Sequence, residues 1–358
     1  MYKRLFIPGP VDVLPECLEQ MATPMIGHRT KDASALQKSI SDNLQKLMFT
    51  ENTILLSTSS GSGLMEGSIR SCTRKRAAVF SVGSFGDRWY EMAQANDIPA
   101  DKFTSEPGKK TSVEMVKEAL DTGKYDVVCV THNETSSGIM NPCDEIGALI
   151  AQYPGVLFLV DAVSSLGGAK IEVDKWGIDV CITSTQKCLG LPPGLSLCSV
   201  SDRAIEAART KENRGFYLDL VKLYDQVKKN DQYPSTPSLS HMFALDYQLK
   251  RIVNEEGIEN RFARHTMLAD KVRAWAEKHF SLFADADCRS NTVCCINNTL
   301  EKDISDLNKK LAEKGFMISN GYGKFKDLTF RIATMADTQE ETLDELLAAI
   351  EEIWELGA

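Results

Sequence analysis

The chain has 358 residues, of which 43% are hydrophobic and 25% are charged. These ordinary values exclude a disordered or fibrous protein, and the length suffices for one large and one smaller domain. Fifty acidic residues against 41 basic ones give a net charge of -9, which argues against a nucleic acid or an anionic membrane as the main partner.

Membrane and export signals are weak in this sequence. Apolar runs reach five residues, as in Val156–Val160, whereas a membrane helix needs about 20. Near the N-terminus, the prolines of Pro8-Gly9-Pro10 break a short apolar run, so no signal-peptide core is formed. Ten cysteines contain no C-x-x-C pair. We therefore expect a cytoplasmic protein with reduced thiols.

Between residues 50 and 200, apolar β-rich runs alternate with stretches of helical periodicity. The predicted strands are Thr53–Leu56, Ala77–Val82, Tyr125–Thr131, Val156–Val160 and Ile178–Thr183, and the predicted helices are Leu64–Cys72, Ser112–Leu120 and Asp144–Gln152. Strands that are apolar on both faces and separated by helices predict an α/β protein with a mostly parallel sheet, covered by helices on both sides.

Beyond residue 202 the pattern changes to longer helices and then to a smaller α/β unit. The predicted helices are Ser238–Asn254, Ile258–His279, Ile304–Lys314 and Thr338–Leu356, and the predicted strands are Thr292–Ile296 and Leu328–Ala333. We predict a large domain over residues 1–250, which includes the N-terminal segment 1–15, and a small C-terminal domain over residues 251–358.

The loop Ser57–Gly63 follows the first of these strands and precedes a helix. In an open parallel sheet, ligands bind at the carboxyl ends of the strands. Small residues, hydroxyl groups and a helix N-terminus together suit a phosphate group. The loop has neither the dinucleotide fingerprint nor the P-loop lysine, and a plain turn is an equally simple interpretation.

Two charged residues follow the last two strands of this run. Asp161 ends the run Val156–Val160, where a carboxylate is costly unless it is paired; capping of the following turn is the alternative explanation. Lys187 follows Ile178–Thr183 among small and apolar residues, where a lysine can act as an imine-forming nucleophile, although most loop lysines are simply solvated.

The three features together indicate pyridoxal phosphate. This cofactor needs an anchor for its phosphate, a carboxylate for its pyridine nitrogen and a lysine that forms a Schiff base with its aldehyde. The five histidines show no metal-ligand spacing, so we expect no metal.

At this point the sequence resembles a known family over nearly its whole length. It is similar to class V aminotransferases of fold type I, in the alanine-glyoxylate and serine-pyruvate branch. The motifs that carry the resemblance are Pro8-Gly9-Pro10, Met25-Ile26-Gly27-His28-Arg29, Glu134-Thr135-Ser136-Ser137-Gly138, the stretch Leu159–Gly168, Ser184-Thr185-Gln186-Lys187, Tyr233-Pro234-Ser235-Thr236-Pro237 and Phe330-Arg331-Ile332.

The resemblance implies a role for each cofactor-binding residue. Lys187 would hold the cofactor as a Schiff base and move a proton between the substrate and the cofactor, and Asp161 would pair with the pyridine nitrogen. The remaining contacts would come from Ser60, Gly61 and Ser62 on the phosphate, Val163 and Phe85 on the ring, Thr135 near the ring hydroxyl and Gln186 on the polar periphery.

The resemblance also implies a shared site and a substrate anchor. Tyr233 and Thr236 match residues that reach the cofactor phosphate of a neighbouring subunit, so a homodimer is expected. Arg331 would bind the substrate α-carboxylate, and Gly9 would place backbone beside the substrate. His28 and Arg29 would bind substrate, or would serve structural roles in a turn and at the dimer interface.

The activity implied is ping-pong transamination through pyridoxamine phosphate, between alanine or serine and glyoxylate or pyruvate. A phosphoserine aminotransferase is the alternative, since that branch also carries a His-Arg pair near its N-terminus. A cysteine desulfurase is remote, because Gln186 precedes the lysine where that family has His, and Cys294-Cys295 lie in a strand-like run.

Overall fold

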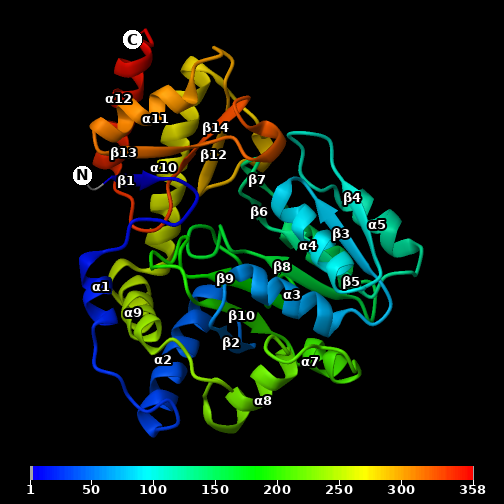
Figure 1. Cartoon of the computed structure of the whole chain (residues 1–358). Helices are drawn as coiled ribbons and strands as arrows, with labels where there is room; N and C mark the ends of the chain where they lie inside the picture. The colour runs from blue at the N-terminus through cyan, green and yellow to red at the C-terminus, as the bar shows by residue number, and fades with distance from the viewer. Residues whose placement is uncertain (1–2, 358) are drawn as a thin grey trace.

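The computed structural model describes residues 3–357 and contains a large and a small sheet (Figure 1). The large sheet has seven strands in the order β2-β10-β9-β8-β5-β3-β4. Their bounds are β2 Thr53–Ser57, β3 Ala77–Ser81, β4 Ala100–Thr104, β5 Val127–Thr131, β8 Leu157–Asp161, β9 Val180–Ser184 and β10 Ser196–Val200. A short hairpin, β6 Asn133–Glu134 with β7 Ile139–Met140, follows β5.

The large sheet is parallel except for β10, which runs antiparallel to both of its neighbours. The carboxyl ends of β2, β3, β5, β8 and β9 therefore lie at one edge. Each of these five strands is buried along its whole length, which agrees with the predicted apolar runs. The polar loops that follow these strands lie at this edge.

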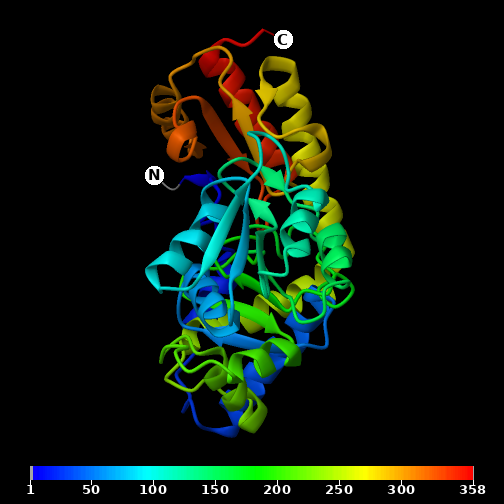
Figure 2. The ribbon, with the colours of Figure 1, turned by 90° about the vertical axis from the view of Figure 1, so that its right-hand side faces the viewer.

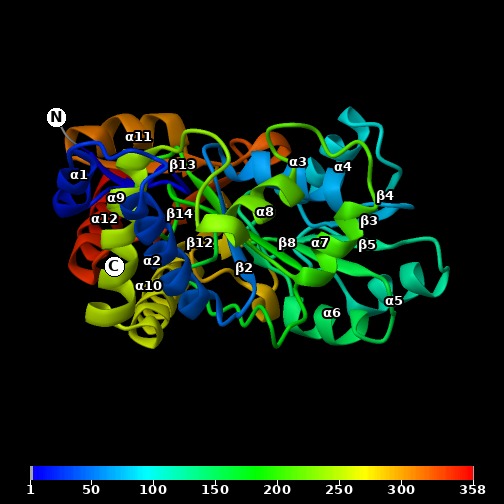
Figure 3. The ribbon, with the colours of Figure 1, turned by 90° about the horizontal axis from the view of Figure 1, so that it is seen from below.

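Helices cover both faces of the large sheet (Figure 3). One face packs on α2 Lys31–Met48, α5 Val113–Asp121, α6 Cys143–Ile150 and α9 Leu239–Lys250, with α1 Pro15–Met21 beside α9. The other face packs on α3 Gly61–Cys72, α4 Ser84–Ala95, α7 Asp202–Arg209 and α8 Leu220–Asn230. Alternate strand residues point to opposite faces, so Ile54 and Leu56 join the first core and Leu55 the second.

The small sheet has the order β1-β13-β14-β12-β11 and stands at one end of the elongated molecule (Figure 2). Its strands are β1 Arg4–Phe6, β11 Ser281–Leu282, β12 Val293–Asn297, β13 Phe316–Asn320 and β14 Thr329–Ala333, packed on α10 Ile258–His279, α11 Ile304–Glu313 and α12 Glu340–Trp354. Because β1 pairs in parallel with β13, the N-terminal residues Arg4–Phe6 complete the sheet of the C-terminal unit.

The junction between the two units lies in the helical stretch predicted as Ser238–Asn254. The structure divides it into α9 and a π-helical segment, Arg251–Glu256, which Gly257 ends with a positive φ of 82°. The predicted division at residue 250 coincides with the end of α9 and remains a prediction about domains.

Residues 3–357 include no helix that is both long enough and apolar enough to cross a bilayer. Within the same residues, no group of three His, Cys, Asp or Glu side chains is arranged to hold a metal ion. All ten cysteines lie in this part of the chain, buried and without a disulfide.

Candidate active site

Three loops at the carboxyl edge of the large sheet bring Asp161, Lys187 and Gly61 together. Asp161 is the last residue of β8, Lys187 lies three residues beyond β9, and Gly61 begins α3 after β2. A Cβ atom on Gly61 would lie 2.5 Å from Cγ2 of Val163, so glycine is needed where the helix meets the turn after Asp161. The predicted phosphate loop therefore packs against Val163, two residues after the predicted aspartate.

Asp161 is a buried carboxylate with few hydrogen-bond donors. Its Oδ1 accepts from the Val163 N–H at 2.9 Å, and its Oδ2 lies 3.5 Å from the Thr131 hydroxyl. The pKa of Asp161 is raised to about 6, mainly by burial and also by the nearby Glu134 carboxyl, against the opposing effects of the Val163 N–H, Arg88 and Lys187. Asp161 thus caps the turn that follows it, which is the alternative role expected from the sequence. Its Oδ2 has only one weak hydrogen bond and can pair with a cationic group.

Lys187 is also enclosed, and its side chain lies against the N-terminal segment. Its Nζ donates to the carbonyl of Pro8, and a Cβ on Gly9, whose φ is +95°, would lie 2.7 Å from that Nζ. Burial lowers the pKa of Lys187 to about 8. Arg331 and Arg88 contribute to this lowering, whereas Cys188 and Asp161 oppose it, so a useful fraction of the amine is uncharged near neutral pH.

The start of α3 could hold a phosphate group. Ser60 is the N-cap residue, but its side chain makes no capping hydrogen bond, and Ser62 Oγ accepts from Arg88 at 3.1 Å. The helix N-terminus adds partial positive charge. Ser60, Gly61 and Ser62 thus face a region with donors and an arginine.

Arg88 was missed by the sequence analysis. It lies in α4, one turn after Phe85, and its guanidinium carbon is 4.6 Å from the centre of the Phe85 ring. Arg88 also acts electrostatically on both Asp161 and Lys187. The sequence did contain a signal for this contact, because residues three apart in a helix lie on the same face, as Phe85 and Arg88 do.

Glu134 was quoted as part of a motif but was given no role. It is fully buried and accepts hydrogen bonds from Phe85 N at 3.0 Å, from Gly86 N at 2.9 Å and from Ser136 through both N and Oγ. Burial raises the pKa of Glu134. Because the Gly83 N-cap offers no side-chain cap to α4, Glu134 holds this helix start, and with it Phe85, in place.

Arg331 projects from β14 of the small sheet toward the same edge. Its Nε donates to the carbonyl of Asn320 at 3.1 Å and its Nη1 to that of Thr135 at 3.1 Å. Nη2 makes no hydrogen bond to any described residue. The guanidinium carbon lies 5.5 Å from the ring of Tyr322, which in turn is 5.6 Å from Phe85. Two carbonyls thus fix the guanidinium and leave one edge for an anion.

The segment 233–236 and the pair His28-Arg29 lie together. Arg29 donates to the carbonyls of Tyr233, Pro234 and Ser235. Tyr233 is buried, its ring is 6.5 Å from that of Tyr217, and its hydroxyl lacks a hydrogen-bond partner. Thr236 is exposed and His28 half-buried. Arg29 thus braces this segment.

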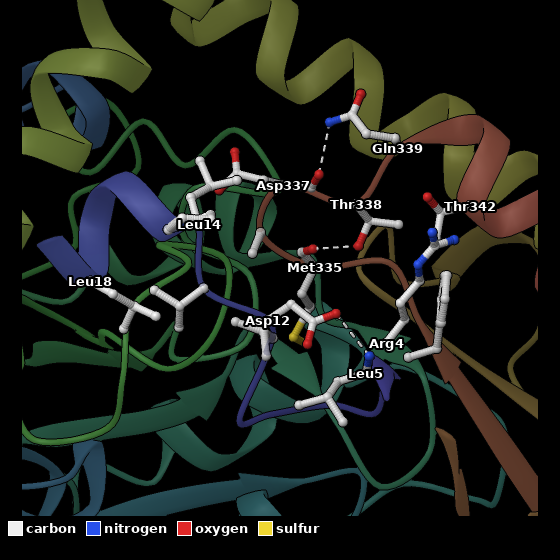
Figure 4. Close-up of a pocket in the computed structure, with 15 residues that line it drawn as sticks. Arg4, Leu5, Asp12, Leu14, Leu18, Met335, Asp337, Thr338, Gln339 and Thr342 are labelled. Atoms are coloured by element: carbon white, nitrogen blue, oxygen red, sulfur yellow. Dashed lines mark hydrogen bonds between the residues drawn. The ribbon is translucent and has the colours of Figure 1, made fainter. Parts of the chain in front are cut away.

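A mainly apolar cavity lies elsewhere, between the N-terminal segment and the loop after β14 (Figure 4). Its volume is about 470 Å³, and Leu5, Leu14, Leu18 and Met335 contribute apolar walls. Asp12 on its wall accepts from Leu5 N at 2.9 Å. Since it includes none of the predicted site residues, we do not assign the chemistry to it.

Comparisons with known proteins agree with this geometry. The family model described as Aminotransferase class-V matches residues 28–338. An uncharacterised aminotransferase of Methanocaldococcus jannaschii is 40% identical over 98% of this chain and 92% of that protein. A serine–glyoxylate aminotransferase of Methylorubrum extorquens is 30% identical over 97% and 90%, respectively. The crystal structure of an alanine–glyoxylate aminotransferase from Nostoc sp. has a TM-score of 0.94 at 27% identity, covering 99% of this chain and 96% of that one.

Proposed function

Because the chain belongs to the class V aminotransferases, we propose that it transfers an amino group from alanine or serine to glyoxylate or pyruvate, with pyridoxal phosphate bound at Lys187. The observation that carries the proposal is the enclosure of Lys187, at a lowered pKa, beside the buried carboxylate of Asp161. The names of similar proteins support small amino acids as donors and glyoxylate as acceptor.

The residues present fit this cofactor. Ser184 Oγ and Gln186 Oε1 are buried without hydrogen-bond partners, and Ser184 Oγ lies 3.5 Å from the position that a Cβ on Gly61 would occupy. Buried polar atoms rarely stay unpaired, so a polar ligand is expected there. Ser60, Gly61 and Ser62 would hold the phosphate, Asp161 the pyridine nitrogen, and Val163 and Phe85 the ring.

When bound, pyridoxal phosphate supplies an electron sink for the carbanion at the substrate α-carbon. Asp161 would keep the pyridine nitrogen protonated, because an ionised carboxylate stabilises a neighbouring cation. Lys187 would move the proton at the α-carbon as general base and acid, for which a pKa of about 8 suits neutral pH. Arg331 orients the substrate through its carboxylate.

A small donor is supported by the surroundings of Arg331. Tyr322 stands beside it and Phe85 beside Tyr322, and the backbone of Pro8 and Gly9 contacts Lys187. For phosphoserine, Arg29 would have to recognise the substrate phosphate. Its guanidinium instead donates to three backbone carbonyls, which favours the structural role.

A cysteine desulfurase would need an accessible cysteine nucleophile on a mobile loop. Cys294 and Cys295 are buried in β12, and burial raises the pKa of Cys295 to about 11. Both features oppose thiolate chemistry.

We further propose a homodimer in which Tyr233 and Thr236 approach the partner's cofactor. Large apolar side chains are exposed near this segment: Phe216 is 78% exposed, Met25 60% and Tyr217 45%. Exposed apolar residues that gather around an expected shared site mark a contact surface.

A donor–acceptor panel tests the proposed reaction. The purified protein, supplied with pyridoxal phosphate, is assayed with alanine or serine plus glyoxylate or pyruvate, and separately with phosphoserine plus 2-oxoglutarate. We expect kcat/KM to be at least about tenfold higher for a small-donor pair, which corresponds to about 1.4 kcal/mol of transition-state binding. A preference for phosphoserine would contradict the proposal, and the K187A variant is the inactive control.

A further inference from the structure

Arg261 in α10 is a fully buried arginine that connects the three loops of the proposed site. Its guanidinium donates to the carbonyls of Gly167 at 2.9 Å, Cys188 at 2.6 Å and Ala336 at 3.2 Å. Gly167 lies in the turn after Asp161, Cys188 is bonded to Lys187, and Ala336 follows the strand of Arg331. One side chain therefore holds the loops of the three residues to which the proposed chemistry is assigned.

Two carboxylates make this buried charge tolerable. Glu256 Oε2 lies 2.6 Å from Arg261 Nη1 and Asp337 Oδ1 lies 3.2 Å from the same atom. Asp337 also accepts from Gln248 Nε2 at 3.0 Å and from Arg251, and it lines the cavity of Figure 4. A buried charge needs such pairing and hydrogen bonding.

The geometry requires a guanidinium rather than an ammonium group. Nε donates to the Gly167 carbonyl, Nη1 to the two carboxylates, and Nη2 to the carbonyls of Cys188 and Ala336. These directions span the planar fork of arginine, whereas lysine offers one nitrogen on a flexible stem. A lysine at this position has three donors on a single nitrogen and cannot make the five hydrogen bonds of Arg261, so it cannot pair with both carboxylates and also hold the carbonyls of Gly167 and Cys188.

We infer that Arg261 is a positioning residue, which sets the orientation of Lys187 relative to Asp161 by clamping the carbonyls of Cys188 and Gly167. The inference rests on the proposed function, because it assumes that Lys187 carries the cofactor. Displacements of about 1 Å at a catalytic group can cost about 100-fold in rate, so a loss of this clamp affects turnover without any contact between Arg261 and the substrate.

Arg264 provides a matched control. It lies three residues further along α10 and donates to Glu256 Oε1, to the carbonyl of Ala336 at 3.0 Å and to that of Thr338 at 2.9 Å. It thus belongs to the same charge network, but it bonds neither Gly167 nor Cys188. Arg264→Lys perturbs the ion pairs with Glu256 that the two arginines share. Arg261→Lys also removes the hydrogen bonds to the carbonyls of Gly167 and Cys188.

The experiment compares wild type, R261K and R264K as purified holoproteins. Visible circular dichroism reports the orientation of bound pyridoxal phosphate, and Tm and steady-state kinetics are measured on the same samples. We expect R261K to lose at least about half of the visible ellipticity and about 10- to 100-fold of kcat, with a smaller change in KM. We expect R264K to lower Tm while keeping the wild-type ellipticity and kcat.

Equal ellipticity in all three proteins, or the same loss in R261K and R264K, would overturn the inference. A wild type that shows no visible cofactor band instead refutes the proposed function, so the two failures are distinguishable. If R261K does not fold, Arg261→Gln is measured with added guanidinium. Recovery of the ellipticity by guanidinium, and not by equal sodium chloride, is expected; no recovery contradicts the clamp.

Discussion

Lys187 is half-buried among opposed charges, and this gives the site its expected pH dependence. Burial lowers its pKa from 10.5 to about 8. At pH 7 about one lysine in ten is then uncharged, against about one in three thousand for an unperturbed side chain. The neutral amine is the nucleophile, so the uncharged fraction of Lys187 limits the rate at which the protein binds the cofactor covalently.

We expect the apoprotein to capture pyridoxal phosphate faster as pH rises. Above pH 7, Asp161 is mostly ionised and changes little, so the second-order rate constant should rise up to about tenfold per pH unit and level off near pH 8. Stopped-flow absorbance measures the rate, with K187A as the control that captures no cofactor. An inflection near 10.5 would show that Lys187 is not perturbed, and a rate that does not change with pH would show that its neutral amine does not limit capture.

Arg331 is expected to bind the carboxylate of every donor and acceptor. In R331K a single ammonium group cannot keep the Asn320 and Thr135 carbonyls and also meet a carboxylate in two places. We expect KM for all donors to rise about 10- to 100-fold, as expected for the loss of one charged hydrogen bond of about 1.5 to 3 kcal/mol.

The control for R331K is R203K. Arg203 forms a comparable two-point ion pair with Asp179, which precedes β9 and so lies at the opposite edge of the sheet. KM should stay unchanged in R203K. A rise in KM for one donor alone in R331K would mean that Arg331 reads side chains rather than the common carboxylate.

At the scale of elements, the start of α3 is set by the lack of a side chain at Gly61. In G61A, the new Cβ would lie 2.5 Å from Val163 Cγ2, so the helix start and the turn after Asp161 must separate. We expect the Kd for pyridoxal phosphate to rise about 10- to 100-fold, equivalent to the loss of one or two charged hydrogen bonds to the phosphate.

G67A is the matched control within the same helix. Its Cβ would meet the carbonyl of Leu218, also at 2.5 Å, but Gly67 lies six residues beyond Gly61. Both variants should lower the Tm of the apoprotein, whereas cofactor affinity, followed by fluorescence titration, should change in G61A alone. Equal cofactor affinities in the two variants would contradict the proposal that the loop Ser57–Gly63 binds the phosphate.

Much of this element structure was predictable because burial on both faces leaves a clear pattern. The predicted Ile258–His279 has the observed bounds of α10, and the predicted run Val156–Val160 differs from β8 by one residue at each end. The predicted α/β fold with a mostly parallel sheet is confirmed by the similarity to the Nostoc structure. These predictions rested on the local pattern of apolar residues.

Long-range contacts were beyond the sequence analysis. The three residues of β1 pair with β13 about 300 positions later, and so short a strand has no periodicity of its own. Glu134, Arg88 and Arg261 look like ordinary charged residues until tertiary contacts surround them. Lys187 and Asp161 were predictable because strand ends in a parallel sheet meet at one edge.

For the whole molecule we expect a homodimer of about 79 kDa, twice the chain mass of 39.6 kDa. Phe216 is 78% exposed beside the segment that would reach the partner site, and a charge there should weaken association. We expect F216D to raise the dimer Kd at least about tenfold, since burying an unpaired charge costs several kcal/mol, and to lose activity at low concentration.

Leu300, 47% exposed in a loop of the C-terminal unit, provides the control variant L300D, which should remain dimeric. Sedimentation velocity measures both proteins. A wild type that is monomeric and fully active would contradict the shared site.

The most direct measurement of the central claim is mass spectrometry of the borohydride-reduced holoprotein. We predict one phosphopyridoxyl group per chain, located by peptide mapping on Lys187, and its loss in K187A. A reduced protein in which Lys187 is unmodified, or in which another lysine carries the group, would contradict the account.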